Sequence, residues 1–224
     1  MLNYDKVNDV LHDVAHFIID MPNNWWSKEI YNKYPDGLID DEDLPHLFIA
    51  GGALVNPLIG DNYIKDYDLY FDDENIANKY RDRFDDLMNT CLYFIKNVFS
   101  YQLTVDNEFL LSFNLDHSRP PKYLMESFDF EHCKVYAYLF DQNSNIPSNY
   151  KSHIYLSETT RRALENKQLI YTNSKMPILA LNRARKFNSR GFSLDKIQFD
   201  RILQDCLLQV TQDDIDHFFT MVNS

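Results

Sequence analysis

Two aspartates separated by one residue, Asp66 and Asp68, have a spacing that points directly to chemistry. Side chains alternate between the two faces of a β-strand, so both carboxylates would lie on one face. Neighbouring carboxylates repel each other unless a cation lies between them. Hard oxygen ligands at this spacing suit Mg²⁺ carrying a bound triphosphate, and Mn²⁺ accepts the same ligands. The pair therefore predicts a metal site that handles a nucleotide.

Two adjacent glycines, Gly51 and Gly52, precede the aspartates by a spacer of thirteen residues. The chain has only five glycines, so this adjacency indicates a specific turn. Leu47–Ala50 predicts a strand before the turn, and a short helix is expected after it. Glycine lets backbone N–H groups approach phosphate oxygens, and a helix start favours negative charge. We therefore predict that Gly51 and Gly52 contact the triphosphate of an NTP, such as ATP, through the backbone.

Together these segments resemble the signature of the nucleotidyltransferase superfamily, the DNA polymerase beta-like enzymes. Its pattern is a hydrophobic residue, two small residues, a spacer and then alternating acidic and hydrophobic residues, which Ala50–Gly52 and Asp66–Leu69 match. The nearest resemblance is to the head domain of tRNA CCA-adding enzymes and bacterial poly(A) polymerases. Gly51–Asn56 is similar to their GGAVRD-like start, and Lys65–Leu69 to their KDIDL-like end. Asn56 departs from that subfamily, which often has arginine followed by aspartate.

The resemblance covers residues 45–140 well and the rest of the chain loosely. It implies an α+β fold, with a small mixed β-sheet head and flanking helices followed by a helical C-terminal region. It also implies an activity: transfer of a nucleoside monophosphate from an NTP to an acceptor hydroxyl, with release of pyrophosphate. In such a two-metal reaction, Asp66 and Asp68 would hold both Mg²⁺ ions.

A third carboxylate is expected from the resemblance, on a neighbouring strand and between hydrophobic residues. Asp129, bracketed by Phe128 and Phe130, fits this description. It would complete one metal site and would accept the proton of the attacking hydroxyl. Glu131 lies on the same face of the expected strand and is the rival. The alternative to both is that these acids simply face solvent.

Three basic residues near the C-terminus, Arg183, Lys186 and Arg190, are spaced three and four apart and would share one helix face. This basic stripe could hold the phosphates of a nucleotide or of an RNA end. A solvated face that balances the acidic surface is equally consistent with the pattern. His132 beside Cys133 suggests a metal site at first sight. Adjacent strand residues face opposite ways, however, so we expect a packed histidine.

Hydrophobic periodicity predicts the elements that position these residues. We expect strands at 101–105, 108–114 and 128–139, and helices at 3–20, 76–87, 157–169, from Pro177, from Ser193 and from Thr211. Residues 141–150 are the most linker-like. They divide the chain into a nucleotidyltransferase head domain, residues 1–150, and a helical region, residues 151–224.

The composition limits the partners and the compartment. A net charge of −12 argues against strong non-specific binding of RNA or DNA. Three widely spaced cysteines offer neither a disulfide framework nor a zinc cluster, and they fit a reducing cytosol. Neither a membrane span nor a signal peptide is evident. We expect a cytoplasmic protein, and the similarity to phage-encoded members of the family would place it in a host cytoplasm.

Three classes of function remain open. The first is an enzyme that tails RNA or tRNA 3′ ends, and the second is an enzyme that nucleotidylates a protein or a small molecule. The third is a non-catalytic relative that binds a nucleotide or a partner protein. The retained acids argue against the third class, and the acidic composition favours the second over the first.

Overall fold

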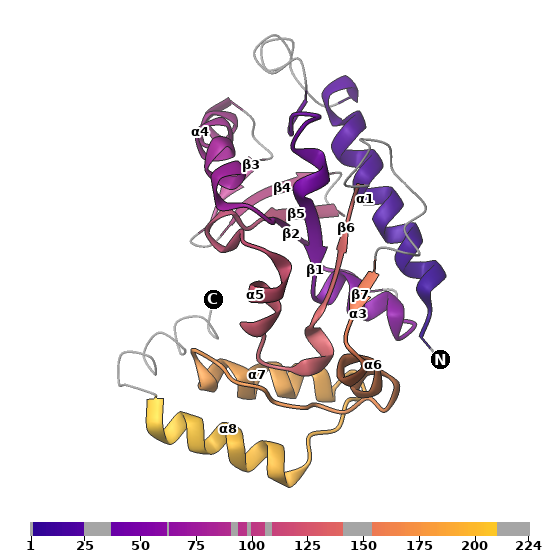
Figure 1. The fold of residues 1–224 in the computed structure, drawn as a ribbon, viewed down its shortest axis with the longest axis vertical. Helices are drawn as coiled ribbons and strands as arrows, with labels where there is room; N and C mark the ends of the chain where they lie inside the picture. Colours follow the sequence, from indigo (N-terminus) through magenta and orange to yellow (C-terminus); the bar gives the residue numbers. More distant parts are fainter. Residues whose placement is uncertain are drawn as a thin grey trace. The chain divides into compact units, whose positions relative to one another are not determined.

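The computed structural model describes residues 2–24, 37–61, 63–90, 94–97, 100–105, 109–140 and 154–209 (Figure 1). Two compact units are distinguished within the chain. Unit 1 comprises Met1–Leu124 and Val135–Tyr155, and unit 2 comprises Met125–Lys134 and Leu156–Ser224. The chain therefore enters unit 2 for a short segment, returns to unit 1, and then completes unit 2.

Unit 1 is built on a mixed seven-stranded sheet with the order β3-β4-β5-β2-β1-β6-β7. The strands are β1 (Leu47–Ala50), β2 (Tyr67–Phe71), β3 (Phe94–Lys96), β4 (Tyr101–Val105), β5 (Phe109–Phe113), β6 (Val135–Tyr138) and β7 (Ile154–Leu156). β1 pairs antiparallel with both β2 and β6, whereas β2 and β5 are parallel. The predicted α+β class with a small mixed sheet is confirmed.

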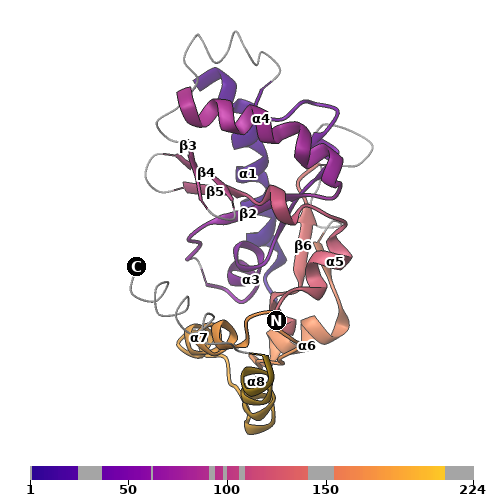
Figure 2. The same cartoon turned by 90° about the vertical axis from the view of Figure 1, so that its left-hand side faces the viewer.

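One face of this sheet packs against α4 (Glu74–Thr90), which runs across the strands in Figure 2. Tyr80 stacks on Phe71 with 5.1 Å between ring centroids, and Phe84 meets Phe113 at 5.0 Å. All four rings are fully buried, each contributing about 2–3 kcal/mol to folding. Because side chains alternate along a strand, this packing leaves Tyr70 and Asp68 of β2 on the opposite face.

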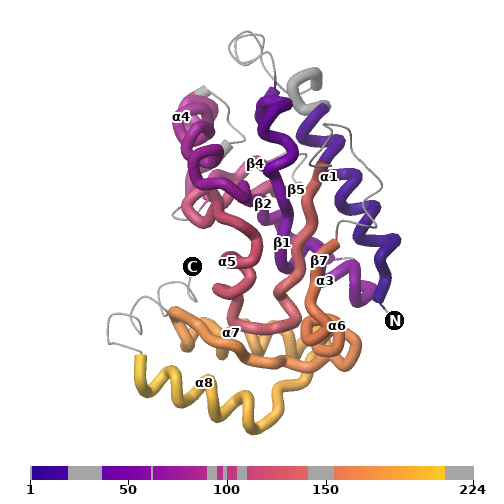
Figure 3. The backbone as a smooth tube through the Cα atoms, in the orientation of Figure 1, coloured from indigo at the N-terminus to yellow at the C-terminus, as the bar shows by residue number. Residues whose placement is uncertain are grey.

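The remaining helices of unit 1 flank the central strands. α1 (Tyr4–Asn24) extends four residues beyond the predicted end and buries Val7, Leu11 and Val14 on one side. α3 (Gly52–Leu58) connects β1 to the segment that leads into β2, a course that can be followed along the tube in Figure 3. α5 (Pro121–Glu126) leads from unit 1 into unit 2.

In its described residues, unit 2 is mainly helical, with isolated β-bridges pairing Phe130 with Tyr171 and Gln168 with Ser193. Its elements are η3 (Glu131–Cys133), α6 (Glu158–Glu165), α7 (Pro177–Asn188) and α8 (Lys196–Gln209). Ser157 caps α6 by accepting a backbone N–H bond at 2.9 Å, and Pro177 is the first residue of α7, as predicted. α8 is capped by Asp195 rather than Ser193, because Asp195 Oδ1 accepts from the Gln198 N–H at 2.8 Å. The helix predicted from Thr211 lies outside the described residues.

The continuous strand predicted over residues 128–139 is wrong. Only Val135–Tyr138 forms a strand, and Glu131–Cys133 forms a short 3-10 helix. The Glu131 N–H donates to the Ile170 carbonyl at 2.9 Å, and the Glu131 side chain accepts a hydrogen bond from Thr160. These contacts with residues distant in sequence override the local alternation of hydrophobic and polar residues.

Candidate active site

Asp66 and Asp68 lie at the start of β2, Asp66 directly before the strand and Asp68 as its second residue. Burial raises the pKa of the Tyr70 phenol well above its usual value, and the charges of Asp68 and Asp66 raise it further. Both carboxylates therefore act on one phenol, and Asp68 and Tyr70, two residues apart in β2, share a sheet face. Extending the antiparallel register of β1 and β2 by one pair places Asp68 opposite Ala50, beside the glycine turn.

The glycine turn follows β1 directly. Gly51 has φ 74° and ψ −133°, a conformation that side chains with a Cβ rarely adopt. Its N–H already donates to the Val135 carbonyl at 3.0 Å. Gly52 is the first residue of α3, where an N–H has no partner within the helix, and a Cβ on Gly52 would meet nothing within 4 Å. The Gly51 N–H is therefore already engaged, whereas that of Gly52 has no partner within the helix; the phosphate contact of both glycines stays a prediction.

Asn56, the residue that departs from the subfamily pattern, has a structural position. Its side chain is buried, and its Nδ2 donates to the Tyr63 carbonyl at 2.6 Å. Its own carbonyl accepts the Asp61 N–H at 2.9 Å. Asn56 thus closes the loop between α3 and β2 that presents the two aspartates.

Asn114, which the sequence analysis did not single out, hydrogen-bonds Asp68. Its Nδ2 donates to Asp68 Oδ1 at 3.2 Å and to the Ser112 carbonyl at 2.9 Å. Its backbone N–H donates to the Leu69 carbonyl at 2.9 Å. The buried amide therefore orients the Asp68 carboxylate. No local pattern reveals this role, because it depends on the parallel pairing of β2 with β5.

The third carboxylate expected on a neighbouring strand is not there. Both strands that flank β2 are described, and β1 reads LFIA while β5 reads FLLSF. The register places Ser112 opposite Asp68. Asp129 lies outside the strands, directly before the bridge residue Phe130. Among the described residues of β1, β2 and β5, neither strand that flanks Asp68 therefore adds a carboxylate to those of Asp66 and Asp68.

Asp129 belongs to unit 2, where its carboxylate pairs with the guanidinium of Arg183 on α7. The Asp129 side chain is 5% exposed and that of Arg183 is 53% exposed. The pKa of the Cys133 thiol is raised to about 12 by burial and by the charge of Asp129, against the opposing charges of Arg183, Lys186 and Arg190. Unit 2 therefore brings Asp129 together with the whole basic stripe.

His132 is a packed neutral imidazole, as expected. It is fully buried, and burial lowers its pKa to about 3. Its ring centroid lies 4.4 Å from that of Phe187 and 4.5 Å from that of Phe192. The two neighbours do not face opposite ways, however, because Cys133 Sγ lies 3.4 Å from His132 Nε2 in the short helix. A thiol of raised pKa beside a neutral imidazole is not an activated nucleophile.

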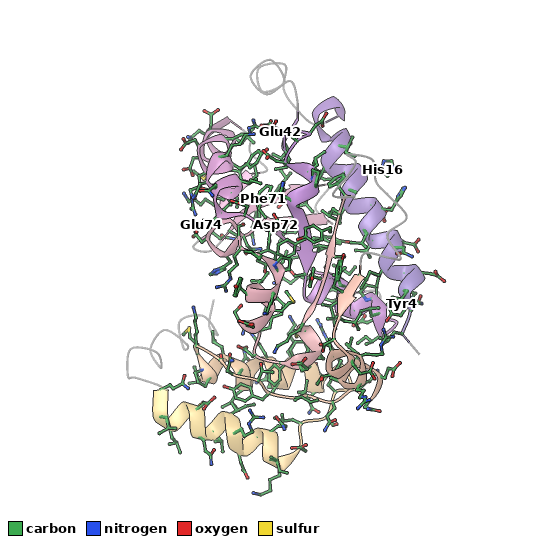
Figure 4. The ribbon with its side chains drawn as sticks, in the orientation of Figure 1. Tyr4, His16, Glu42, Phe71, Asp72 and Glu74 are labelled. Atoms are coloured by element: carbon green, nitrogen blue, oxygen red, sulfur yellow. The ribbon has the colours of Figure 1, made fainter. Side chains whose placement is uncertain are left out.

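A second polar network lies at the far end of β2, where Asp72 follows the strand (Figure 4). Asp72 Oδ2 accepts the Tyr138 hydroxyl at 2.9 Å, and Asp72 Oδ1 lies 2.8 Å from His46 Nδ1. The Asp72 N–H also donates to the His46 carbonyl at 3.0 Å. These bonds connect the ends of three adjacent strands, β2, β1 and β6.

Three carboxylates before β1, those of Asp40, Glu42 and Asp43, have oxygens within 4.8 Å of one another and form the acidic cluster (Figure 4 labels Glu42). The ammonium of Lys79 already lies among them, at 2.8, 3.1 and 2.8 Å. Its hydrogen bonds to Asp40 and Asp43 raise the pKa of Lys79. The Tyr80 hydroxyl donates to Asp43 at 2.6 Å. This cluster is therefore an internal ion-pair network that fixes residues 40–43 to α4.

We expect Lys79→Met to destabilise the protein by about 1–2 kcal/mol, measured by urea unfolding. The substitution leaves the nearly buried Asp43 beside two other carboxylates, and the effect is moderated because Lys79 is 40% exposed. Added Ca²⁺ should restore part of the loss, since it can take the place of the ammonium. Lys196→Met, which removes an exposed pair with Asp200 on α8, is the matched control and should change stability very little. Equal effects of the two substitutions would contradict the assignment.

The fold is that of nucleotidyltransferases, as comparison with solved structures shows. A CCA-adding enzyme in apo form I is similar with a TM-score of 0.51 and 13% identity, over 81% of this chain and 43% of that chain. A tRNA-processing enzyme in apo form I has a TM-score of 0.50 and 13% identity, over 88% and 47%. The Thermotoga maritima CCA-adding enzyme complexed with tRNA has a TM-score of 0.48 and 12% identity, over 84% and 44%. The chain thus spans less than half the length of each of these proteins.

Comparison of sequences gives a family. No curated protein sequence matches the chain. Among the described helices, none combines the length and the apolar character needed to cross a bilayer. The model of the Gabija anti-defense 2 family protein matches residues 23–167, which is more than half of the 224 residues. This chain belongs to the Gabija anti-defense 2 family.

Proposed function

We propose that the protein is a metal-dependent nucleotidyltransferase that moves a nucleoside monophosphate from an NTP to an acceptor hydroxyl. The observation that carries this proposal is the placement of Asp66 directly before β2 and of Asp68 within it, opposite Ala50 and so beside the open glycine turn at Gly52. Paired carboxylates next to an accessible backbone suit a divalent cation bound to phosphates. The nucleotidyltransferase fold supports the same conclusion.

Each residue has a part in this proposal. Asp66 and Asp68 would hold the metal, and Asn114 would keep Asp68 in the ligating orientation. Bound Mg²⁺ would supply the positive charge that neutralises the phosphates and the leaving pyrophosphate. The acceptor oxygen bonds to the α-phosphorus while the bond from that phosphorus to pyrophosphate breaks, and the Gly52 N–H contacts a phosphate oxygen. The sequence predicts Asp129 as a further metal ligand and acceptor of the hydroxyl proton; within unit 2 its carboxylate pairs with Arg183.

The acceptor is proposed from the family and from the charge of the chain. The family name connects its members with overcoming a defence called Gabija. We therefore propose that the acceptor is a protein or a small molecule of that defence. The net charge of −12 supports this acceptor over a nucleic acid. An RNA 3′ end is the second candidate, favoured by the basic stripe, whose three charges all act on Cys133.

The experiment is a labelling survey with the intact protein. Each α-labelled NTP is incubated with Mg²⁺, the protein, and extracts of cells with and without the Gabija defence. We expect label on a component present only in the defence-bearing extract. Label on RNA in both extracts would select the second candidate. Absence of label from every fraction, with a protein shown to be folded, would contradict nucleotidyl transfer.

We propose that the basic stripe of unit 2 binds nucleotide phosphates, which a double variant tests. Lys186→Ala with Arg190→Ala should weaken Mg²⁺·ATP binding roughly fivefold to tenfold at low salt and by less at high salt, because screening weakens the parent's contacts. Arg183 is left intact because it pairs with the buried Asp129. Arg161→Ala with Arg162→Ala on α6 makes the same charge change and should have little effect. An equal loss in both double variants would indicate a general charge effect instead.

A further inference from the structure

Two tyrosines of unit 1 form a stacked pair at the edge of the sheet. Tyr136 of β6 and Tyr155 of β7 have ring centroids 4.8 Å apart and an interplanar angle of 10°. Tyr155 is 44% exposed. β7 is a three-residue edge strand in which only Tyr155 is exposed. This strand therefore exposes one aromatic ring, that of Tyr155, which is stacked on the ring of Tyr136.

The pair lies on the sheet face that carries the candidate catalytic aspartates. The register pairs Ala50 of β1 with Tyr136 of β6, and its extension pairs Ala50 with Asp68 of β2. Side chains directly opposite each other in a sheet point to the same face. Tyr155 stacks on Tyr136 and also meets Tyr138 edge-on with a centroid distance of 6.4 Å, which places it on this face.

The position of the pair relative to the aspartates matches the dimensions of a nucleotide. Asp68 and Tyr136 are two strands apart, about 10 Å between backbones. The Gly51 N–H donates to the carbonyl of Val135, directly before Tyr136, so the glycine turn lies at the same level. On the other side of Asp68 the same row is polar, with Gln102 Nε2 donating to Ser112 Oγ at 3.3 Å. An aromatic surface is therefore available on the β1–β6 side of the aspartates.

We infer that Tyr136 and Tyr155 form a stacking platform for the base of the incoming NTP. The inference rests on the proposed function, because it takes the triphosphate to lie at Asp66, Asp68 and Gly52. Every nucleobase has a π-face, so stacking on an exposed aromatic ring accepts any base and adds affinity without reading hydrogen bonds. The ribose spans the interval between the metal-bound phosphates and the platform. Selection among bases would then come from residues outside the platform.

The test separates the base from the triphosphate. Binding of tripolyphosphate and of the α,β-methylene analogues of the four NTPs is measured in Mg²⁺ without acceptor, for the parent, Tyr155→Ala and Tyr155→Phe. We expect Tyr155→Ala to weaken binding of the nucleotide analogues about tenfold and to leave binding of tripolyphosphate unchanged. Tyr155→Phe keeps the ring and should bind like the parent. Tyr123→Ala, which removes another exposed tyrosine, is the matched control.

The outcomes distinguish this inference from the proposed function. If the parent binds nucleotide analogues and tripolyphosphate but Tyr155→Ala binds both as the parent does, the platform is wrong and the proposed function stands. An equal loss of tripolyphosphate and nucleotide binding in Tyr155→Ala also overturns the platform, because the base is then not the group that the ring contacts. If the folded parent binds neither ligand in Mg²⁺, the platform and the proposed function are both overturned.

Discussion

Asp68→Asn should reduce nucleotide transfer by about a thousandfold, equivalent to ~4 kcal/mol of lost transition-state stabilisation. The substitution removes one of two paired negative charges while keeping the shape of the side chain. Asparagine also retains an oxygen that can accept the hydrogen bond from Asn114. Removing a repulsion between neighbouring carboxylates should leave the metal-free fold intact. The rate is measured with the acceptor found by labelling, and the melting temperature in metal-free buffer should stay within a few degrees of the parent's.

The matched control for this variant is Asp116→Asn. This substitution makes the same chemical change at the surface, where the Asp116 side chain is 52% exposed and pairs with Arg81. Transfer by the control should be close to that of the parent. Unchanged transfer in Asp68→Asn would remove the basis of the catalytic assignment. A large fall in its melting temperature would show that Asp68 has a structural role instead.

Gly52→Val should weaken NTP binding by about fiftyfold or more, ~2.3 kcal/mol. A Cβ at this position meets no protein atom within 4 Å, so the valine side chain would project into the space assigned to the triphosphate. For the same reason the stability should change by less than about 1 kcal/mol. Binding of Mg²⁺·ATP and urea unfolding are measured on the same preparation.

Gly51→Ala provides the contrast, because the neighbouring glycine is constrained in a different way. Its φ of 74° with ψ −133° is unfavourable for any residue with a Cβ, and we expect a loss of about 1–3 kcal/mol in stability. The two substitutions should therefore have different effects: Gly52→Val should weaken NTP binding, and Gly51→Ala should lower stability. If Gly52→Val leaves NTP affinity unchanged, the phosphates bind elsewhere.

The central part of the site was predictable because its signals are local. The strand Leu47–Ala50, the glycine turn and the alternation through Asp66 and Asp68 all lie within one short segment. The direction of the side chains there follows from their alternation along a strand, and the turn follows from the backbone conformations that glycine can adopt. The similarity to nucleotidyltransferases indicated by this segment is confirmed by the fold.

The surroundings of the site were not predictable, because they depend on contacts between distant segments. Asn114 reaches Asp68 only through the pairing of β2 with β5, which brings together residues 46 positions apart. Asp129 was predicted on a strand from the alternation of Phe128–Phe130. Its actual environment is set by Arg183, 54 positions later. In each case a tertiary contact outweighed the local preference that the sequence expresses.

Ser112, and not a carboxylate, lies opposite Asp68 on the neighbouring strand β5, and this has a consequence for the order of binding. The two aspartates of β2 carry two negative charges, which balance a single divalent cation. A second cation at this end of the sheet would need the charge of the nucleotide's phosphates to hold it. We therefore expect free Mg²⁺ to occupy the protein weakly, and nucleotide and metal to strengthen each other's binding reciprocally. The reaction would then respond to the concentration of the metal–nucleotide complex rather than to that of free Mg²⁺.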